Sequence, residues 1–154
     1  MKTTNLSRTG LQDAGLLVMR LMVGWVFLYH GGQKMFGWFG GSGIEGFAGF
    51  LESLSIPLPL LNAYAAAGTE LLGGLALITG LGVRLVSFPL AATMLVAAFT
   101  VHGGKFGAQQ GGMESPLTLA AIVIGLGLTG AGRFALRPAS ARDGRAVKPV
   151  AAAA

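Results

Sequence analysis

The sequence contains no cysteine, only two histidines and few charged residues among its 154 positions. The lack of cysteine excludes disulfides, thiolate metal sites, iron–sulfur clusters and thiol redox chemistry. Charged residues make up 11% of the chain, whereas ordinary soluble domains have about 25%. Hydrophobic residues reach 53% and glycine occurs 26 times, a usage typical of membrane helices. The composition therefore indicates an integral membrane protein.

The net charge of +5 does not indicate nucleic-acid binding, because the lysines and arginines stand at the ends of apolar runs. Membrane proteins use cations at such positions to fix their orientation. We therefore expect membrane lipid around the protein and no nucleic-acid partner. A chain of 154 residues has room for one folded domain.

Four apolar segments predict four membrane-spanning helices, although the last segment is short. They cover residues 14–35, 58–81, 83–101 and 115–129. They define a membrane domain at 14–137, preceded by a cytoplasmic tail at 1–13 and followed by a disordered basic cytoplasmic tail at 138–154. Between the first two segments, residues 44–54 predict a short amphipathic helix along the membrane surface.

The distribution of cations predicts that both termini are cytoplasmic. Eight lysines and arginines lie in the two tails, the end of the last segment and the loop between the second and third segments. Only Lys34 and Lys105 lie in the other two loops. These two loops are therefore expected at the outer face of the membrane.

An internal repeat accompanies the apolar segments. His30-Gly31-Gly32 and His102-Gly103-Gly104 each follow an apolar run, and a lysine and a Phe-Gly pair come after each. Residues 74–84 resemble residues 125–133, since both stretches are rich in glycine and end in arginine. The repeat predicts an all-α integral membrane four-helix bundle, built from two similar helical hairpins with the same orientation.

Glu70 is the strongest single candidate for a functional residue, because it lies near the middle of the second apolar segment. An ionised side chain in that position costs roughly 2.5–3.5 kcal/mol on membrane-insertion scales. Small residues on its helical face indicate that Glu70 points into the bundle. Arg20 in the first segment is the expected partner, since the two residues are predicted to lie at compatible depths. The pair either fixes helix packing or forms a proton or ligand site, and the sequence leaves both open.

The two histidines, His30 and His102, are predicted to meet near the outer surface, where they are suited to proton exchange near neutral pH. We expect a polar pocket that they share with Lys34, Lys105 and Glu114. The alternatives are ordinary interfacial histidines bonded to backbone carbonyls, and two axial ligands of a haem. Two histidines and one distant carboxylate do not form a convincing metal-binding pattern, so no metal is expected.

The motifs that carry a family resemblance run through the whole apolar part of the chain, over about residues 15 to 135. They are Arg20, His30-Gly31-Gly32-Gln33-Lys34, Glu70-Leu71-Leu72-Gly73-Gly74, Arg84, Thr100-Val101-His102, Gly112, Glu114 and Gly130-Ala131-Gly132-Arg133-Phe134. In this order they resemble the DoxX family of small four-helix membrane proteins. Ala131 departs from the pattern, because members often have a proline between these glycines.

The resemblance implies an oxidoreductase, or an oxidoreductase subunit, that supports quinone-linked electron transfer in the bacterial plasma (inner) membrane. Related subunits belong to a thiosulfate–quinone oxidoreductase. A quinone head group is expected between the first and third segments, where His30 and His102 exchange its protons and Lys34 bonds a carbonyl oxygen. Glu70 and Arg20 hold the bundle or relay a proton.

Without cysteine or a flavin motif, the electrons are expected from a protein partner or a bound cofactor. The alternative is a non-enzymatic small membrane carrier or scaffold subunit, in which Glu70 and Arg20 set helix packing. The sequence leaves open the substrate, the partner and whether the protein forms a homo-oligomer.

Overall fold

The computed structural model describes residues 10–136, and this part of the chain is helical and contains no β-strand, which confirms the all-α prediction. The main helices are α1 (Gly10–Phe36), α2 (Gly43–Ser53), α3 (Pro59–Thr79), α4 (Val83–Val96) and α5 (Glu114–Thr129). Short 3-10 turns lie at Trp38–Gly40 and Ala108–Gln110, and a π-helical turn at Ala97–Val101 continues α4. The predicted tail at 138–154 and positions 1–9 of the predicted N-terminal tail lie outside the described residues.

Within residues 10–136, three helices are long and apolar enough to cross a membrane. They are α1, α3 and the continuous helix formed by α4 and the π turn, Val83–Val101. The fourth predicted span corresponds to α5, which is apolar but has only 16 residues. A helix of that length covers about 24 Å, less than the roughly 30 Å of a typical hydrocarbon core.

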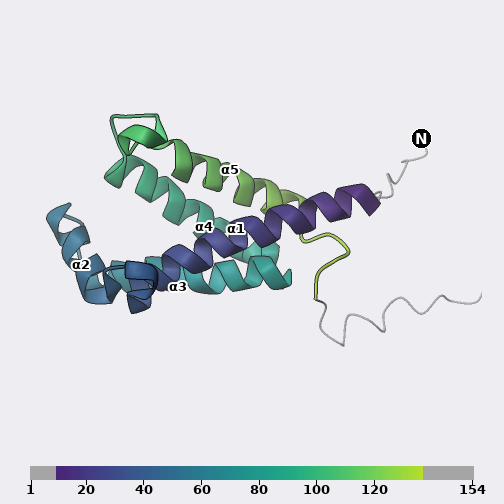
Figure 1. Cartoon of the computed structure of the whole chain (residues 1–154), viewed down its shortest axis with the longest axis horizontal. Helices are drawn as coiled ribbons and strands as arrows, with labels where there is room; N and C mark the ends of the chain where they lie inside the picture. The colour runs from purple at the N-terminus through teal and green to yellow at the C-terminus, as the bar shows by residue number, and fades with distance from the viewer. Residues whose placement is uncertain (1–9, 137–154) are drawn as a thin grey trace, which may run out of the picture.

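The helices α1, α3, α4 and α5 run alternately between two ends of the molecule (Figure 1). The start of α1, the α3–α4 connection and the end of α5 lie at one end, which we call the turn end. The helix α2 and the α4–α5 connection lie at the other, which we call the α2 end. The most extensive helix packing is between α1 and α3 and between α4 and α5, while α2 packs against α3 and α1.

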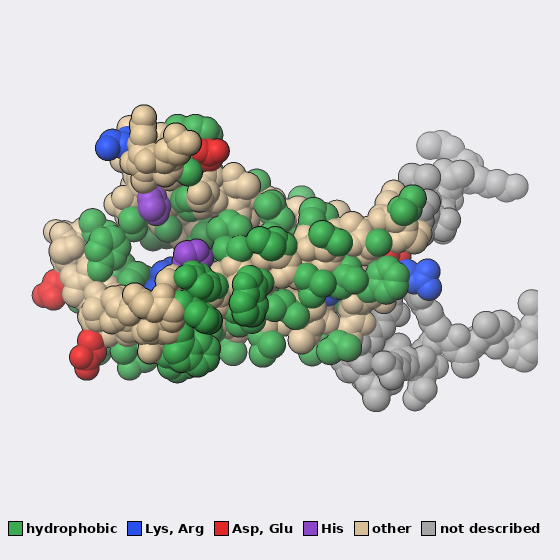
Figure 2. Space-filling model, viewed as in Figure 1, with side chains coloured by type: hydrophobic (Ala, Val, Ile, Leu, Met, Phe, Trp, Pro, Cys, Tyr) green, Lys and Arg blue, Asp and Glu red, His purple; other side chains and the backbone are tan. Residues whose placement is uncertain are grey.

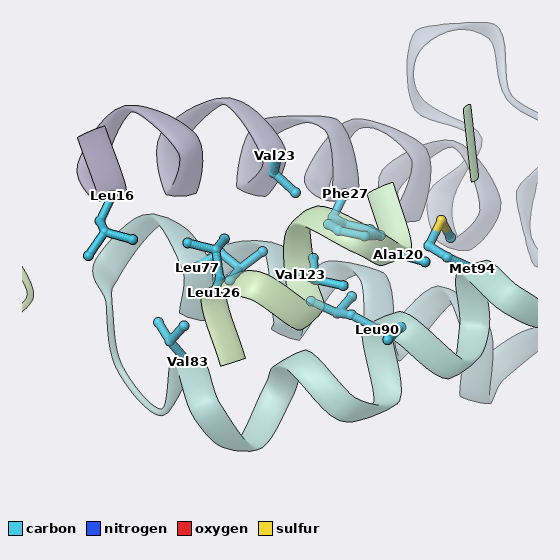
Figure 3. Close-up of a cluster of buried hydrophobic side chains, with 11 residues drawn as sticks. Leu16, Val23, Phe27, Leu77, Val83, Leu90, Met94, Ala120, Val123 and Leu126 are labelled. Atoms are coloured by element: carbon cyan, nitrogen blue, oxygen red, sulfur yellow. The ribbon is translucent and has the colours of Figure 1, made fainter. Parts of the chain in front are cut away.

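The hydrophobic core joins these two helix pairs. Figure 3 shows Leu16, Val23 and Phe27 of α1 pointing toward side chains of the other long helices. Leu77, Leu90 and Val123 are completely buried among them. Burying such apolar side chains favours helix association through close packing, which drives assembly inside a membrane as well as in water.

Glycines bring the backbones of α1 and α3 into direct contact. A Cβ atom added at Gly74 would lie 2.7 Å from the carbonyl oxygen of Gly24 and 2.9 Å from the backbone nitrogen of Leu28. A Cβ added at Gly31 would lie 3.1 Å from the Cβ of Glu70. Small residues permit this close approach between membrane helices. The contacts also fix the antiparallel register, with Gly24 opposite Gly74 and Gly31 opposite Glu70.

The short helix predicted between the first two spans is present as α2. Its buried residues Ala48 and Leu51 pack against Ala63 of α3. The prolines that follow it end the helix and start α3, because Pro59 occupies the first turn, where a missing N–H costs nothing. This arrangement places α2 over one end of the α1–α3 pair.

The close contact at Gly74 predicts opposite effects for two alanine substitutions in α3. We expect Gly74→Ala to destabilise the protein by about 1–3 kcal/mol, since the new methyl group meets backbone atoms that cannot move aside. The matched Gly68→Ala adds its methyl group to open space, and the better helix propensity of alanine stabilises by up to about 1 kcal/mol. Equilibrium unfolding in mixed micelles measures the free energy of unfolding of both variants. Equal changes in that free energy would contradict the close packing at Gly74.

Candidate functional site

A buried ion pair lies at the α2 end of the α1–α3 pair. Lys34 Nζ, in the last turn of α1, donates to Glu70 Oε1 at 2.5 Å. The Glu70 side chain is completely buried, whereas 26% of the Lys34 side chain is exposed. Lys34 also lies over the ring of Phe47 in α2, 5.2 Å from its centroid. The second carboxylate oxygen, Glu70 Oε2, has no hydrogen-bond partner among the described residues.

The predicted pairing of Glu70 with Arg20 is wrong, and the helix register explains why. Gly31 lies opposite Glu70, and Arg20 precedes Gly31 by eleven positions. That separation is about 16 Å along a helix, too far for the guanidinium to reach the carboxylate. Arg20 and Glu70 have similar depths only if both helices end level at the turn end. In the structure α1 begins at Gly10 and extends well beyond the end of α3.

Arg20 instead binds the chain that follows α5 at the turn end. Its Nη2 donates to the carbonyl oxygen of Phe134 at 2.8 Å. The side chain is completely buried, and its Nε and Nη1 have no hydrogen-bond partner within residues 10–136. A second link holds the same segment, because Leu136 N donates to Thr79 O at 2.9 Å. Arg20 therefore attaches the segment after α5 to the α1–α3 pair and is remote from the histidines.

Two adjoining cavities meet at the Lys34–Glu70 pair. The first, which we call the α2 chamber, has a volume of about 360 Å³ and lies between α2, α3 and the end of α4. The second, the α5 chamber, has about 330 Å³ and lies between α1, α4, α5 and the α4–α5 connection. Four residues line both chambers, and they are Lys34, Glu70, Ala97 and His102. Figure 2 shows histidine side chains beside a hollow at this end of the molecule.

The local backbone turns His102 toward both chambers. It directly follows the π turn, and its N–H donates to Ala97 O at 3.2 Å, five residues back. One extra residue in a helical turn rotates the following side chains by about 100° relative to a regular α-helix. Its Nδ1 lies 2.7 Å from Gly111 O. Because a carbonyl oxygen only accepts, Nδ1 carries the proton and Nε2 of the neutral ring is left as an acceptor.

His30 lines the α5 chamber from the opposite wall, within α1. Its Nδ1 lies 3.1 Å from the side-chain oxygen of Gln33, and its ring meets that of Tyr29 edge to face. The amide oxygen also only accepts, so His30 likewise presents Nε2 as an acceptor. The α5 chamber therefore has two imidazoles, one ammonium group and one buried carboxylate in its walls.

Glu114 and Lys105 do not line either chamber. Glu114 Oε2 accepts a hydrogen bond from the backbone N–H of Ala108 at 2.8 Å, and Lys105 is exposed. The bond at Ala108 stabilises the α4–α5 connection, which also carries Gly111, the partner of His102. Glu114 thus supports the shape of the chamber wall without facing the cavity.

Several residues that line the chambers were not predicted as site residues from the sequence. Asn62, Thr69 and Thr100 add polar groups to the α2 chamber, and Phe47 and Leu51 of α2 close one side of it. The amphipathic pattern of residues 44–54 was the available signal for α2. Thr69 carries no signal in a single sequence, whereas Thr100 belongs to the Thr100-Val101-His102 motif. The Thr100 hydroxyl donates to Val96 O at 2.7 Å, a bond that threonine often makes to its own helix backbone.

The chemistry available to this site is proton exchange next to an apolar cavity. No group of three or more His, Asp or Glu side chains within residues 10–136 is arranged to hold a metal ion. The unpartnered Glu70 oxygen and the two Nε2 atoms are hydrogen-bond acceptors, and Lys34 is a donor. Such a small set of converging polar groups in a mainly apolar cavity is typical of a site for an organic ligand.

Comparisons with known proteins agree with the motifs. The DoxX family model matches residues 15–103. A protein of Bacillus subtilis (strain 168) named Putative oxidoreductase CatD is 35% identical over 127 residues, which cover 82% of this chain and 87% of that protein. No solved structure matches the chain.

The observed pairing predicts a specific pattern of energetic coupling. In a double-mutant cycle, Glu70→Gln and Lys34→Met should couple by roughly 1–3 kcal/mol, because either substitution alone leaves the other partner without its counter-charge. In the matched cycle of Glu70→Gln with Arg20→Met, the two changes in unfolding free energy should add within about 0.5 kcal/mol, since these residues share no contact. Unfolding free energies in micelles provide the measurement. Strong coupling to Arg20 and none to Lys34 would restore the pairing expected from sequence.

Proposed function

Because this chain belongs to the DoxX family, we propose that it is an oxidoreductase or oxidoreductase subunit that serves quinone-linked electron transfer in a bacterial plasma membrane. The similarity to a protein named as an oxidoreductase supports the reaction class. The site supports the ligand class, because an apolar cavity meets imidazole, ammonium and carboxylate groups at one place.

The membrane arrangement is also part of the proposal. Four spans form two helical hairpins, α1 with α3 and α4 with α5, with both termini in the cytoplasm. The extensive packing within each of these pairs supports it. The larger number of lysines and arginines toward the turn end supports the orientation. The α2 end, with both histidines, then faces the outer side of the membrane.

The observation that carries the ligand assignment is the position of the Lys34–Glu70 pair between two chambers. The α2 chamber is mostly apolar and suits a ring with a hydrophobic tail, whereas the α5 chamber adds both histidines. Each volume falls in the range of roughly 300–1,000 Å³ that is usual for organic ligands. A ligand ring that reaches the shared residues has donors and acceptors on both sides.

A bound quinone supplies a redox couple that takes up protons on reduction and releases them on oxidation. Lys34 Nζ donates a hydrogen bond and adds positive charge beside the ring position. Nε2 of His102 and of His30 accepts a proton from the ligand side or returns one to it. Glu70 Oε2 is within the same walls and is a hydrogen-bond acceptor without a partner among the described residues. Electrons come from a protein partner or a further bound cofactor, since the chain has no thiol to carry them.

The alternative function is a non-enzymatic carrier or scaffold subunit. The Lys34–Glu70 pair itself favours it, because the pair joins α1 to α3 beside the close contact at Gly31 and serves packing without any ligand. The two functions differ in one measurable property, which is saturable binding of a quinone.

Quinone binding tests the proposal directly. Purified protein in nanodiscs should bind a short-chain quinone analogue in a saturable manner. His102→Gln should weaken binding by roughly two- to tenfold, the effect of one lost hydrogen bond. Lys105→Gln is the matched control, since Lys105 is exposed and outside both chambers. Wild-type protein without saturable binding would reject the quinone site and leave the scaffold function.

The orientation is testable because the chain has no cysteine of its own. We expect Lys105→Cys, at the α2 end, to react with a membrane-impermeant maleimide added to intact spheroplasts. Leu136→Cys, whose side chain is 60% exposed at the turn end, should react only after the membrane is permeabilised. The opposite labelling pattern would invert the proposed topology.

A further inference from the structure

The glycine–arginine half of the internal repeat forms a second site, at the turn end. Gly80 and Gly82 have φ angles of 80° and 61°, and Gly130 and Gly132 have φ angles of 80° and 74°. All four residues therefore have positive φ angles, which glycine adopts more readily than any other residue. An arginine follows each pair, and the folded chain brings both arginines to one pocket of about 610 Å³.

Arg84 and Arg133 are the cations of this pocket, and both side chains are exposed. Arg84 lies against Gly130, where an added Cβ would be 3.2 Å from its Nε. The Arg133 guanidinium lies 5.6 Å from the ring centroid of Phe134. Neither guanidinium has a hydrogen-bond or ion-pair acceptor among the described residues. Both are therefore available to a ligand from outside.

One acidic side chain also lines the pocket. Asp13 is buried, and its Oδ1 accepts the backbone N–H of Arg133 at 3.0 Å. The carboxylate thus positions the segment that carries Arg133. Two arginines and one aspartate leave the lining with one excess positive charge. An anionic group is the complementary ligand.

The apolar surroundings decide what kind of anion fits. Leu85, which lines the pocket, is 77% exposed, and Phe88, one turn further along α4, is 73% exposed. Leu128, beside the lining residue Thr129 on α5, is 76% exposed. In a membrane these side chains face acyl chains rather than water. The pocket thus combines a cationic head with apolar sides, as expected for an amphiphile.

We propose that this turn-end pocket binds the phosphate group of an anionic phospholipid, with Arg84 and Arg133 as its ligands. Arginine forms charge-assisted hydrogen bonds with phosphate oxygens in a fixed geometry. Basic pockets between membrane helices are suited to anionic head groups on the cytoplasmic side. The site is separate from both chambers and does not depend on the quinone proposal.

Native mass spectrometry of the full chain in detergent tests this assignment. Phosphatidylglycerol should be retained in preference to phosphatidylcholine with the same acyl chains. Arg84→Gln and Arg133→Gln should each weaken phosphatidylglycerol binding by about fivefold, and the double variant should lose the preference. Lys105→Gln, an exposed cation at the opposite end, should leave it unchanged.

Three further measurements separate lipid binding from effects on folding and from binding of free phosphate. The conservative double variant Arg84→Lys with Arg133→Lys should retain most of the preference. Thermal unfolding should be similar in all variants, because neither guanidinium has an acceptor within residues 10–136. Inorganic phosphate should not displace the lipid at equal concentration. Equal lipid binding by wild type and the double glutamine variant would overturn the proposal. Displacement by inorganic phosphate would overturn the lipid assignment.

Discussion

The buried carboxylate of Glu70 is the constraint on which the rest of the structure depends. A carboxylate without any exposure must be paired, because the cost of burying it alone exceeds what packing can offset. Within the described part of the chain, the cation that pairs with it is Lys34, at the far end of α1. The pair therefore requires α1 and α3 to be antiparallel in one register, and the glycines between them let the backbones approach closely enough to keep it. Because both chambers meet at this pair, the contact that sets the register also sets the position of the site.

The cavities occur at one end because the two helix pairs separate there. Near the middle and the turn end, core side chains such as Leu77 and Leu126 fill the space between the pairs. Toward the α2 end the pairs diverge (Figure 1), and α2 and the α4–α5 connection cover the gap without filling it. The π turn belongs to this region, and it directs His102 to the junction of the two chambers. A regular helix there would aim the same residue elsewhere, and π turns are frequent at functional sites for this reason.

Apolar run lengths and the amphipathic pattern of residues 44–54 were sufficient to predict the helices, including α2. The predicted polar pocket joined both histidines to Lys34, but it also included Lys105 and Glu114, which line neither chamber. The sequence patterns could not predict the partner of Glu70, because pairing depends on helix register, and register depends on which glycines meet. An error of a few residues at the end of α1 shifts Arg20 by a full turn or more. The π turn also has no signature in residues 97–101, which are apolar apart from Thr100. The pairing of Glu70 and the π turn both arise from tertiary packing and not from the helix propensity of the local sequence.

The two copies of the internal repeat are more alike at the turn end of the molecule than at the α2 end. At the turn end all four repeated glycines have positive φ angles, and each pair precedes an arginine that lines the same pocket. At the α2 end the repeated histidines differ, because His30 lies within α1 whereas His102 follows the last helical turn. The second copy also has Ala121 where the alignment of the glycines places Glu70 in the first, and Lys105 is exposed. One copy thus supplies the ion pair and the other supplies the second imidazole. A ligand between the chambers contacts both copies, so an isolated hairpin would lack half of the polar groups of the site.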